Sequence, residues 1–302
     1  MNNRRILAVG SVALDSVKTP FGEVRDALGG SATFFSASAR FFSPVSVVAV
    51  VGEDFPVKHL NLMRRLGVDT RDLKVAPGKT FRWKGFYDYD LNNAQTLKTE
   101  LNVFQTFKPK LSEENRQSAF IFLANIDPEI QQSVLSQVQR PLLTACDTMN
   151  YWIQNKKSGL LRLLKQVDIF LCNDSEARQL AGQVNLIQCA RWILRHGPKI
   201  LVIKKGEHGV ICFSKNFVFL APAFLLENVF DPTGAGDAFA GGFMGYLTRS
   251  PRLEERVVRR AIIYGSVLAS FNVESFSLNR LARLKPHEVA ARYHQFRRMT
   301  KF

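Results

Sequence analysis

Short apolar segments alternate with amphipathic segments along most of the chain. The apolar segments are rich in Val, Ile, Leu and Phe, which is typical of strands that a sheet buries on both faces. We expect such strands at 6–12, 45–51, 120–124, 142–146, 169–172 and 200–203. We expect helices between them at 31–42, 59–66, 129–138 and 190–196. This alternation predicts an α/β fold with a mostly parallel sheet, helices on both faces, and ligands at the carboxyl ends of the strands.

Residues 80–107 interrupt this alternation with an aromatic and polar stretch that has no helical period. Alternating positions at 81–84 and 101–104 predict antiparallel strands. We expect a small β-lid over the active site, to which residues 17–24 are a candidate addition; an ordinary surface hairpin is the alternative. No repeat, low-complexity tract or linker divides the sequence, so we expect a single domain over residues 1–302.

Length and composition narrow the class of protein. A chain of 302 residues suffices for one large α/β domain, and its 46% hydrophobic and 22% charged residues are ordinary for a globular enzyme. No apolar run approaches the roughly 20 residues that cross a bilayer. The basic N-terminus leads into apolar residues 6–9, but the run breaks at Gly10, which favours a buried strand over a signal peptide. We therefore expect a cytoplasmic protein without a membrane partner.

The formal net charge of +15 is unusual for a metabolic enzyme. Lys and Arg concentrate at 249–260 and 280–301, where we interpret them as solvated faces of terminal helices. Nucleic-acid binding is the alternative. The sequence has no basic stripe interleaved with aromatic residues, which argues against this alternative. The positive field favours anionic nucleotides as ligands.

The four cysteines are widely spaced along the chain, with no CxxC pair and no His at ligand spacing. We expect buried free thiols rather than disulfides or a metal site. A reducing compartment is the setting in which such thiols persist.

The segment 231–237, with the sequence DPTGAGD, carries the most specific chemistry of the chain. Small and apolar residues follow it and predict a tightly packed helix. Small residues at a helix start leave the N–H groups of Gly234, Ala235 and Gly236 free for a phosphate or a developing anion, which the helix dipole also favours. Asp237 would repel an anion that is merely bound, so we interpret it as the base that takes a proton from an attacking hydroxyl. The alternative is a glycine-rich cap in which Asp237 stabilises the first turn.

This segment resembles the C-terminal signature D-T-x-G-A-G-D of the ribokinase family, the PfkB-type carbohydrate kinases. Gly29-Gly30 is similar to the N-terminal di-glycine signature of that family, and Asn173-x-x-Glu176 matches its N-x-x-E motif. The resemblance implies a ribokinase-like three-layer sandwich with a small β-lid. It also implies a kinase that uses ATP and Mg²⁺ to phosphorylate a hydroxyl of a small carbohydrate or polyol.

The resemblance places the acceptor against the N-terminal motifs. Asp15, at the end of the first expected strand, is implied to hold acceptor hydroxyls, and the backbone of Gly29 and Gly30 to lie against the acceptor. Phe34 stands where family members commonly have an Asn that contacts the sugar, which indicates a more apolar pocket or one that stacks on a ring. A nucleoside therefore stays open as the acceptor. Asp147, at the end of another expected strand, is a further candidate from its position alone.

Asn173 and Glu176 are implied to position magnesium and phosphate, through water. The same residues are a good helix start, which is the structural alternative. Because a helix start at the carboxyl end of a strand serves both roles, the two interpretations are compatible.

The remaining nucleotide-binding candidates lie in a turn and in the segment 231–237. Lys204, Gly206 and Gly209 belong to a turn similar to the one that passes the nucleotide in the family, and a plain hairpin is the alternative. Family members often have Thr or Ser where this chain has Lys204, which would meet a phosphate as a point charge. Thr233 completes the set.

Two further segments with family character are interpreted as architectural. Asp54 is expected to cap the helix that follows it, and Gly67 to end that helix. The resemblance also leaves a homodimer open, since lids of related enzymes pair between subunits in some cases. A non-catalytic small-molecule sensor is the remaining alternative, against which the intact Asp237 argues.

Overall fold

The computed structural model describes residues 4–250 and 252–301, and within these residues ten strands form one large sheet. The order across the sheet is β14-β13-β12-β11-β10-β9-β1-β4-β5, and β6 pairs with β4. The strands are β1 (Ile6–Val9), β4 (Val45–Gly52), β5 (Val68–Asp69), β6 (Leu73–Ala76), β9 (Phe120–Leu123), β10 (Leu143–Cys146), β11 (Ile169–Asn173), β12 (Ile200–Lys204), β13 (Val210–Ser214) and β14 (Val218–Ala221). Pairing is parallel except at β13 and β14. The predicted mostly parallel sheet is therefore confirmed.

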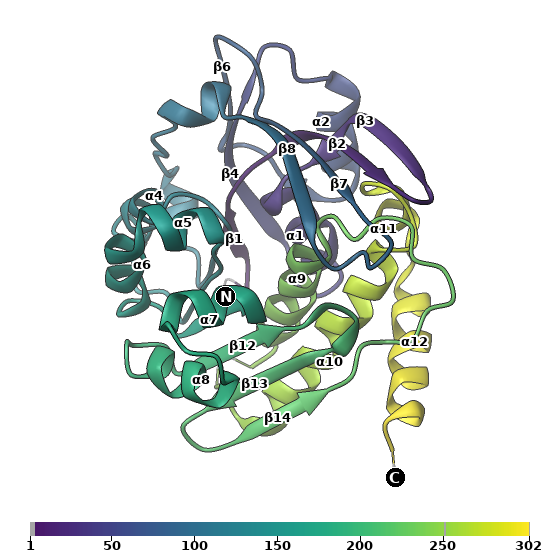
Figure 1. Cartoon of the computed structure of the whole chain (residues 1–302). Coiled ribbons are helices and arrows are strands. Elements are labelled where there is room, and N and C mark those ends of the chain that lie inside the picture. Colours follow the sequence, from purple (N-terminus) through teal and green to yellow (C-terminus); the bar gives the residue numbers. More distant parts are fainter. Residues whose placement is uncertain (1–3, 251, 302) are drawn as a thin grey trace.

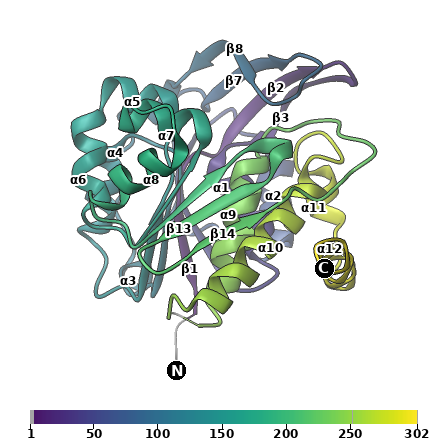
Figure 2. The ribbon, with the colours of Figure 1, turned by 60° about the horizontal axis from the view of Figure 1, so that its bottom comes forward.

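Helices cover both faces of this sheet, as Figures 1 and 2 show. One face carries α4 (Pro128–Leu135), α5 (Asn150–Asn155), α6 (Lys157–Leu164), α7 (Asp174–Ala181) and α8 (Leu186–Leu194). The other face carries α1 (Ser31–Ala39), α9 (Ala235–Leu247) and α10 (Glu255–Asn272). Further helices are α2 (Val57–Arg65), α3 (Glu113–Arg116), α11 (Asn279–Arg283) and α12 (Pro286–Met299).

Alternate residues of each central strand supply the two faces of the core. In β1, Leu7 and Val9 pack on the side of α4–α8, whereas Ile6 and Ala8 pack on the side of α1, α9 and α10. All four side chains are fully buried. This explains why the parallel strands are continuously apolar in the sequence.

A second sheet of four strands, here called the small sheet, lies across one end of the sandwich (Figure 2). Its order in the described residues is β3-β2-β7-β8, with β2 (Ala13–Thr19), β3 (Gly22–Gly29), β7 (Arg82–Tyr87) and β8 (Ala94–Glu100). The strands β2 and β7 pair in parallel, and β3 and β8 are antiparallel at the two edges. The sequence predicts a β-lid from these two regions of the chain; its action as a lid stays a prediction.

The prediction of a strand at 101–104 is wrong. A 3₁₀ helix, η1 (Asn102–Thr106), occupies this segment, and the antiparallel partner of β7 is β8. Val103 and Phe104 of this helix are both buried and belong to the same core cluster, on the side of α4–α8. Asn102 has φ 49°, and its amide donates to the carbonyl oxygen of Thr80 at 2.9 Å.

The expected capping role of Asp54 is also wrong. Helix α2 begins after Pro56 without a side-chain cap. The Asp54 carboxylate instead accepts bonds from the backbone N–H and the hydroxyl of Thr80, both at 2.7 Å, and pairs with Arg82 at 2.7 Å. Asp54 therefore joins the end of β4 to the start of β7. Gly67 follows α2 with φ 78°, in agreement with its predicted role at the helix end.

The remaining composition-based expectations concern the thiols and the basic C-terminal region. All four cysteines are free and buried, as expected. Arg280 and Arg292 on the C-terminal helices pair with Glu274, and Arg280 also pairs with Glu288. Acidic neighbours thus offset part of this local charge. No helix within the described ranges 4–250 and 252–301 has the length and apolar character needed to cross a membrane.

Candidate active site

The segment 231–237 forms the turn into α9, and Gly234 decides the shape of this turn. Gly234 has φ 74°, a left-handed conformation that residues with a side chain rarely adopt. The Phe34 ring from α1 fills the adjacent space, so that a β-carbon at position 234 would lie 2.3 Å from a ring atom. Conformation and space both require glycine here.

Hydrogen bonds from distant parts of the chain hold this turn. The Asp231 carboxylate accepts the N–H of Thr233 at 2.9 Å and the N–H of Ser277 at 3.2 Å. The Asn272 amide, on α10, donates to the carbonyl oxygen of Thr233 at 2.8 Å. Burial raises the pKa of Asp231, and the hydrogen bonds from Thr233 and Ser277 partly oppose the rise. Asn272 and Ser277 are not predictable from the sequence as site residues, because only the fold brings them to the turn.

The start of α9 supplies N–H donors, with one departure from expectation. The N–H groups of Gly234 and Gly236 meet no acceptor in the part of the chain that the structure describes. The N–H of Ala235, in contrast, donates to the carbonyl oxygen of Pro232 at 3.1 Å. Of the three predicted donors, those left for an anion are therefore the N–H groups of Gly234 and Gly236, at the positive end of the helix dipole.

Asp237 lies in the first turn of α9, and Lys204 is the last residue of β12. A β-carbon at Gly236 would lie 2.9 Å from the Nζ of Lys204, so the ammonium group lies directly against the helix start. Burial raises the pKa of Asp237 to about 6, and the positive charge of Lys204 limits that rise. Such a carboxylate is ionised near neutral pH and still accepts a proton readily, which suits a general base.

Asp147 and Glu176 belong to the same charged cluster. Burial, followed by the negative charge of Asp237, raises the pKa of Asp147 well above its usual range, while Lys204 opposes the rise. Burial also raises the pKa of Glu176, and the positive charge of Lys204 again opposes the rise. The Oδ1 atom of Asp147 is buried and has no hydrogen-bond partner among the described residues. One ammonium group therefore acts on three carboxylates, of which Asp147 and Glu176 are buried.

Asn173 and Glu176 form the helix start that the sequence predicts. The Asn173 Oδ1 accepts the N–H of Glu176, and the Glu176 Oε2 accepts the N–H of Asn173, both at 2.7 Å. Within the described residues, no group of three His, Cys, Asp or Glu side chains is arranged to hold a metal ion. Magnesium favours oxygen ligands and keeps much of its hydration shell, so these residues and Asp147 fit a magnesium ion held through water.

Asp15 lies in β2 of the small sheet, not at the end of the first strand as the sequence suggests. Its Oδ2 accepts the N–H of Gly30 at 3.3 Å. A β-carbon at Gly29 would lie 1.9 Å from this oxygen, so glycine permits the close approach of β3. Burial raises the pKa of Asp15 to about 7; the Gly30 N–H opposes the rise, and the charges of Asp231 and Asp237 add to it.

Phe34 is 2% exposed because its ring packs on the turn at Gly234. The recess around it leaves no room for a water molecule and is lined by Asp15, Val17, Val24, Ala27, Leu28, Phe34, Asp231, Thr233 and Ser277. The ring that the sequence offers for stacking on an acceptor is thus packed against the polypeptide itself.

Tyr87, the last residue of β7, is a site residue that is not predicted from the sequence. Its hydroxyl lies 3.4 Å from the Oγ1 of Thr233. Burial raises the pKa of Tyr87, and the negative charges of Asp231, Asp15 and Asp237 add to the rise. Tyr87 therefore keeps its proton and presents a neutral donor among carboxylates. Its position follows from the pairing of β7 with β2, which the sequence pattern does not reveal.

Gly206 and Gly209 shape the turn after β12, which contains η2 (Gly206–His208). Gly206 lies beside Asn92 in the β7–β8 loop of the small sheet. The Asn92 amide donates to the Glu207 carboxylate at 3.0 Å. Of the residues predicted to meet the nucleotide in this turn, Lys204 reaches α9, and the two glycines join the turn to the small sheet and to β14.

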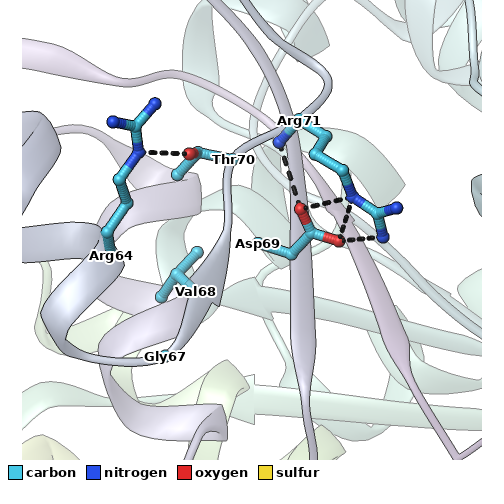
Figure 3. Close-up of a pocket in the computed structure, with 6 residues that line it drawn as sticks. All are labelled: Arg64, Gly67, Val68, Asp69, Thr70 and Arg71. Atoms are coloured by element: carbon cyan, nitrogen blue, oxygen red, sulfur yellow. Dashed lines mark hydrogen bonds and ion pairs between the residues drawn. The ribbon is translucent and has the colours of Figure 1, made fainter.

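A surface hollow of about 400 Å³ lies elsewhere, at the α2–β5 turn, and is lined by Arg64, Gly67, Val68, Asp69, Thr70 and Arg71 (Figure 3). Arg71 pairs with Asp69 at 2.6 Å, and the Nε of Arg64 donates to Thr70 at 3.3 Å. Its polar groups thus bond to one another, and none of the predicted site residues lines it.

Comparison with known proteins identifies the family and the fold. A model of the pfkB family carbohydrate kinases matches residues 1–283. The chain is 30% identical over 257 residues to a cytidine kinase of Thermococcus kodakarensis, covering 83% of this chain and 91% of the relative. It is 27% identical over 309 residues to an inositol 3-kinase of Arabidopsis thaliana, covering 94% and 79%.

Solved structures show the same fold at low sequence identity. A nucleoside kinase of Methanocaldococcus jannaschii, a member of the ribokinase family, has a TM-score of 0.78 at 19% identity and covers 97% of this chain and 98% of its own. A protein from E. coli in complex with ATP and Mg²⁺ has a TM-score of 0.79 at 16% identity, covering 96% and 99%. The fold is therefore ribokinase-like, and the chain belongs to the pfkB family of carbohydrate kinases.

Proposed function

We propose that the protein transfers the γ-phosphoryl group of ATP to a hydroxyl of a small carbohydrate, polyol or nucleoside. One observation carries the proposal: Asp237, the ammonium group of Lys204 and two N–H groups without acceptors meet at the start of α9. Phosphoryl transfer needs positive donors for the phosphate charge and a base for the attacking hydroxyl within one site. Membership of the pfkB family supports the same reaction class.

The acceptor is oriented by the small-sheet end of the site. The Asp15 carboxylate, fixed by the N–H of Gly30, has lone pairs for acceptor hydroxyls. The neutral Tyr87 hydroxyl supplies a donor near the same position. Fixing the acceptor in this way makes the attack effectively intramolecular.

The reaction itself takes place over α9. Asp237 takes the proton of the acceptor hydroxyl while the oxygen forms a bond to the γ-phosphorus, and the bond from that phosphorus to the β–γ bridging oxygen breaks, which releases ADP. The N–H groups of Gly234 and Gly236 and the Lys204 Nζ stabilise the charge on the transferred group. Ala235 contributes through the turn, since its own N–H is bonded to Pro232.

The nucleotide lies, in this proposal, along the β11 and β12 ends of the sheet. Mg²⁺ bound with ATP would neutralise phosphate charge, and Asn173 and Glu176 would hold the ion through its water shell. Thr233 and the turn containing Gly206 and Gly209 flank the nucleotide. A solved structure of the same fold is a complex with ATP and Mg²⁺, which supports the choice of these two ligands.

The test is an acceptor panel with purified protein, ATP and Mg²⁺. Cytidine, adenosine, myo-inositol, ribose and fructose are scored by acceptor-dependent ADP release and by the mass of the phosphorylated product. We expect at least one phosphorylated product. Ligand binding without turnover for every acceptor would instead support a non-catalytic sensor.

A further inference from the structure

The site-facing side of the small sheet carries the indole of Trp83 beside the Asp15 carboxylate, which is proposed to bind the acceptor. Asp15 on β2 is the register partner of Trp83 on β7, and Val17 is the partner of Gly85. Register partners on neighbouring strands point to the same face of a sheet. Because Asp15 points to Gly30 and the site, Trp83 belongs to the site-facing side.

The indole of Trp83 is held in a defined position. It extends over Gly85, where a β-carbon would lie 2.4 Å from its Cζ2 atom. Its Nε1 donates to the Oγ1 of Thr96 on β8 at 3.1 Å. The indole N–H is therefore satisfied within the protein, and Trp83 remains partly exposed. Such a ring offers stacking without needing a hydrogen bond from a ligand.

The other aromatic candidate does not offer a free face. Phe34 is 2% exposed, and its ring contacts the Gly234 turn. Tyr87 directs its hydroxyl to Thr233. Two aromatic residues thus lie on the site-facing side of β7. Tyr87 bonds to the turn at 231–237, whereas Trp83 makes no such bond among the described residues.

We propose that Trp83 determines specificity by stacking on the planar ring of a nucleoside acceptor whose sugar hydroxyls are held by Asp15. This rests on the proposed kinase function and names nucleosides as its acceptor class. Stacking favours any flat π-system and gives little to a saturated polyol, because a polyol has no π-face. The 30% identity to a cytidine kinase supports the same class.

The first test measures binding without turnover. Cytidine or adenosine added without ATP is expected to quench tryptophan fluorescence in the wild type and in Trp192→Phe, whose indole lies on α8. In Trp83→Phe the quenching signal is expected to disappear. Equal quenching in Trp83→Phe and the wild type would overturn the proposal, and so would absence of quenching in the wild type.

The second test measures specificity. Trp83→Leu is expected to raise the KM for the nucleoside roughly 10-fold, with kcat and the KM for ATP nearly unchanged, and Trp83→Phe to restore most of the loss. Gly85→Ala, which displaces the intact indole, is expected to act in the same direction. Unchanged nucleoside KM in Trp83→Leu overturns the proposal, as does a panel in which inositol or fructose exceeds every nucleoside. The kinase function then still stands, since it fails only when no acceptor is phosphorylated.

Discussion

The two ends of the site are built in different ways. At the α9 end, the groups come from one contiguous segment, 231–237, together with Lys204 at a strand end. At the small-sheet end, Asp15 and Tyr87 come from two strands that pair only in the folded protein. The α9 end presents N–H donors, an ammonium group and the carboxylate of Asp237, whereas the small-sheet end presents the carboxylate of Asp15 and the hydroxyl of Tyr87.

This difference separates reaction type from acceptor choice. A contiguous turn fixes the positions of its own N–H groups, so the chemistry at α9 depends on local backbone geometry. The arrangement of side chains on the small sheet depends on strand register. A shift of the register by one residue would turn each side chain of the shifted strand to the opposite face. We therefore expect substitutions at α9 to lower kcat, and substitutions in the small sheet to change the acceptor KM.

Among substitutions outside the base itself, the largest effect is expected from Gly234→Ala. The new β-carbon meets the Phe34 ring and a strained backbone together, so the turn must shift. A misplacement of this kind lowers kcat by about 100-fold, and the thermal midpoint falls as well.

The matched control for this glycine is Gly182→Ala. Gly182 also has a left-handed φ, 65°, but no atom lies within 4 Å of the added β-carbon. It incurs only the backbone strain of roughly 1 kcal/mol and should leave kcat unchanged. Equal losses of kcat in the two variants would contradict the role of the Gly234 turn.

The next effect is expected from Lys204→Met. Loss of the ammonium group removes charge stabilisation from the transferred phosphoryl group, and kcat falls roughly 30-fold. Lys204 also limits the pKa rise of Asp237, so the acid limb of the rate profile moves to higher pH. Because the base must be ionised, activity rises with pH through that limb. Steady-state kinetics from pH 5 to 9 measure both changes, and Lys205→Met, which removes the neighbouring charge, is the control.

A smaller effect is expected from Tyr87→Phe. Only the hydroxyl near Thr233 is lost, so kcat/KM for the acceptor falls roughly 5-fold while the KM for ATP is retained. Tyr89→Phe removes a hydroxyl from the same hairpin, at a residue that is 89% exposed. Indistinguishable kinetics of the two variants would show that Tyr87 has no part in the acceptor end.

The smallest effect is on stability and comes from Asp15→Asn. The folded-state pKa of Asp15 is raised from 3.8 to about 7, so its stabilising contribution is present below pH 4 and lost as the pH rises through 7. The neutral Asn avoids this loss and should raise the thermal midpoint by about 5 °C at pH 8, with the difference shrinking toward pH 4. Thermal melts across this range are the measurement. Asp90→Asn, at an exposed position, should show no such pH dependence.

Local sequence patterns predict much of this molecule. The apolar segments at 45–51 and 169–172 are strands, because continuous burial leaves an unmistakable composition. The Asn173–Glu176 capping box also follows from spacing alone. Family membership and the mostly parallel sheet can also be predicted from local sequence patterns.

Features that depend on contacts between distant parts of the chain could not be predicted from the sequence. Residues 101–104 alternate like a strand, yet Val103 and Phe104 are buried together in the core as a 3₁₀ helix. Asp54 resembles a helix cap, but Thr80 and Arg82 bind it instead. The placement of Tyr87 near Thr233 required the register of β7 against β2.

The proposed phosphoryl transfer depends most on Asp237 as the base. The direct measurement is kcat of Asp237→Asn with the best acceptor of the panel, together with the Kd for ATP by calorimetry. We expect kcat to fall by about 1000-fold while ATP binding stays within a factor of two or three, because the amide cannot take the proton. Turnover within tenfold of the wild type would contradict the account.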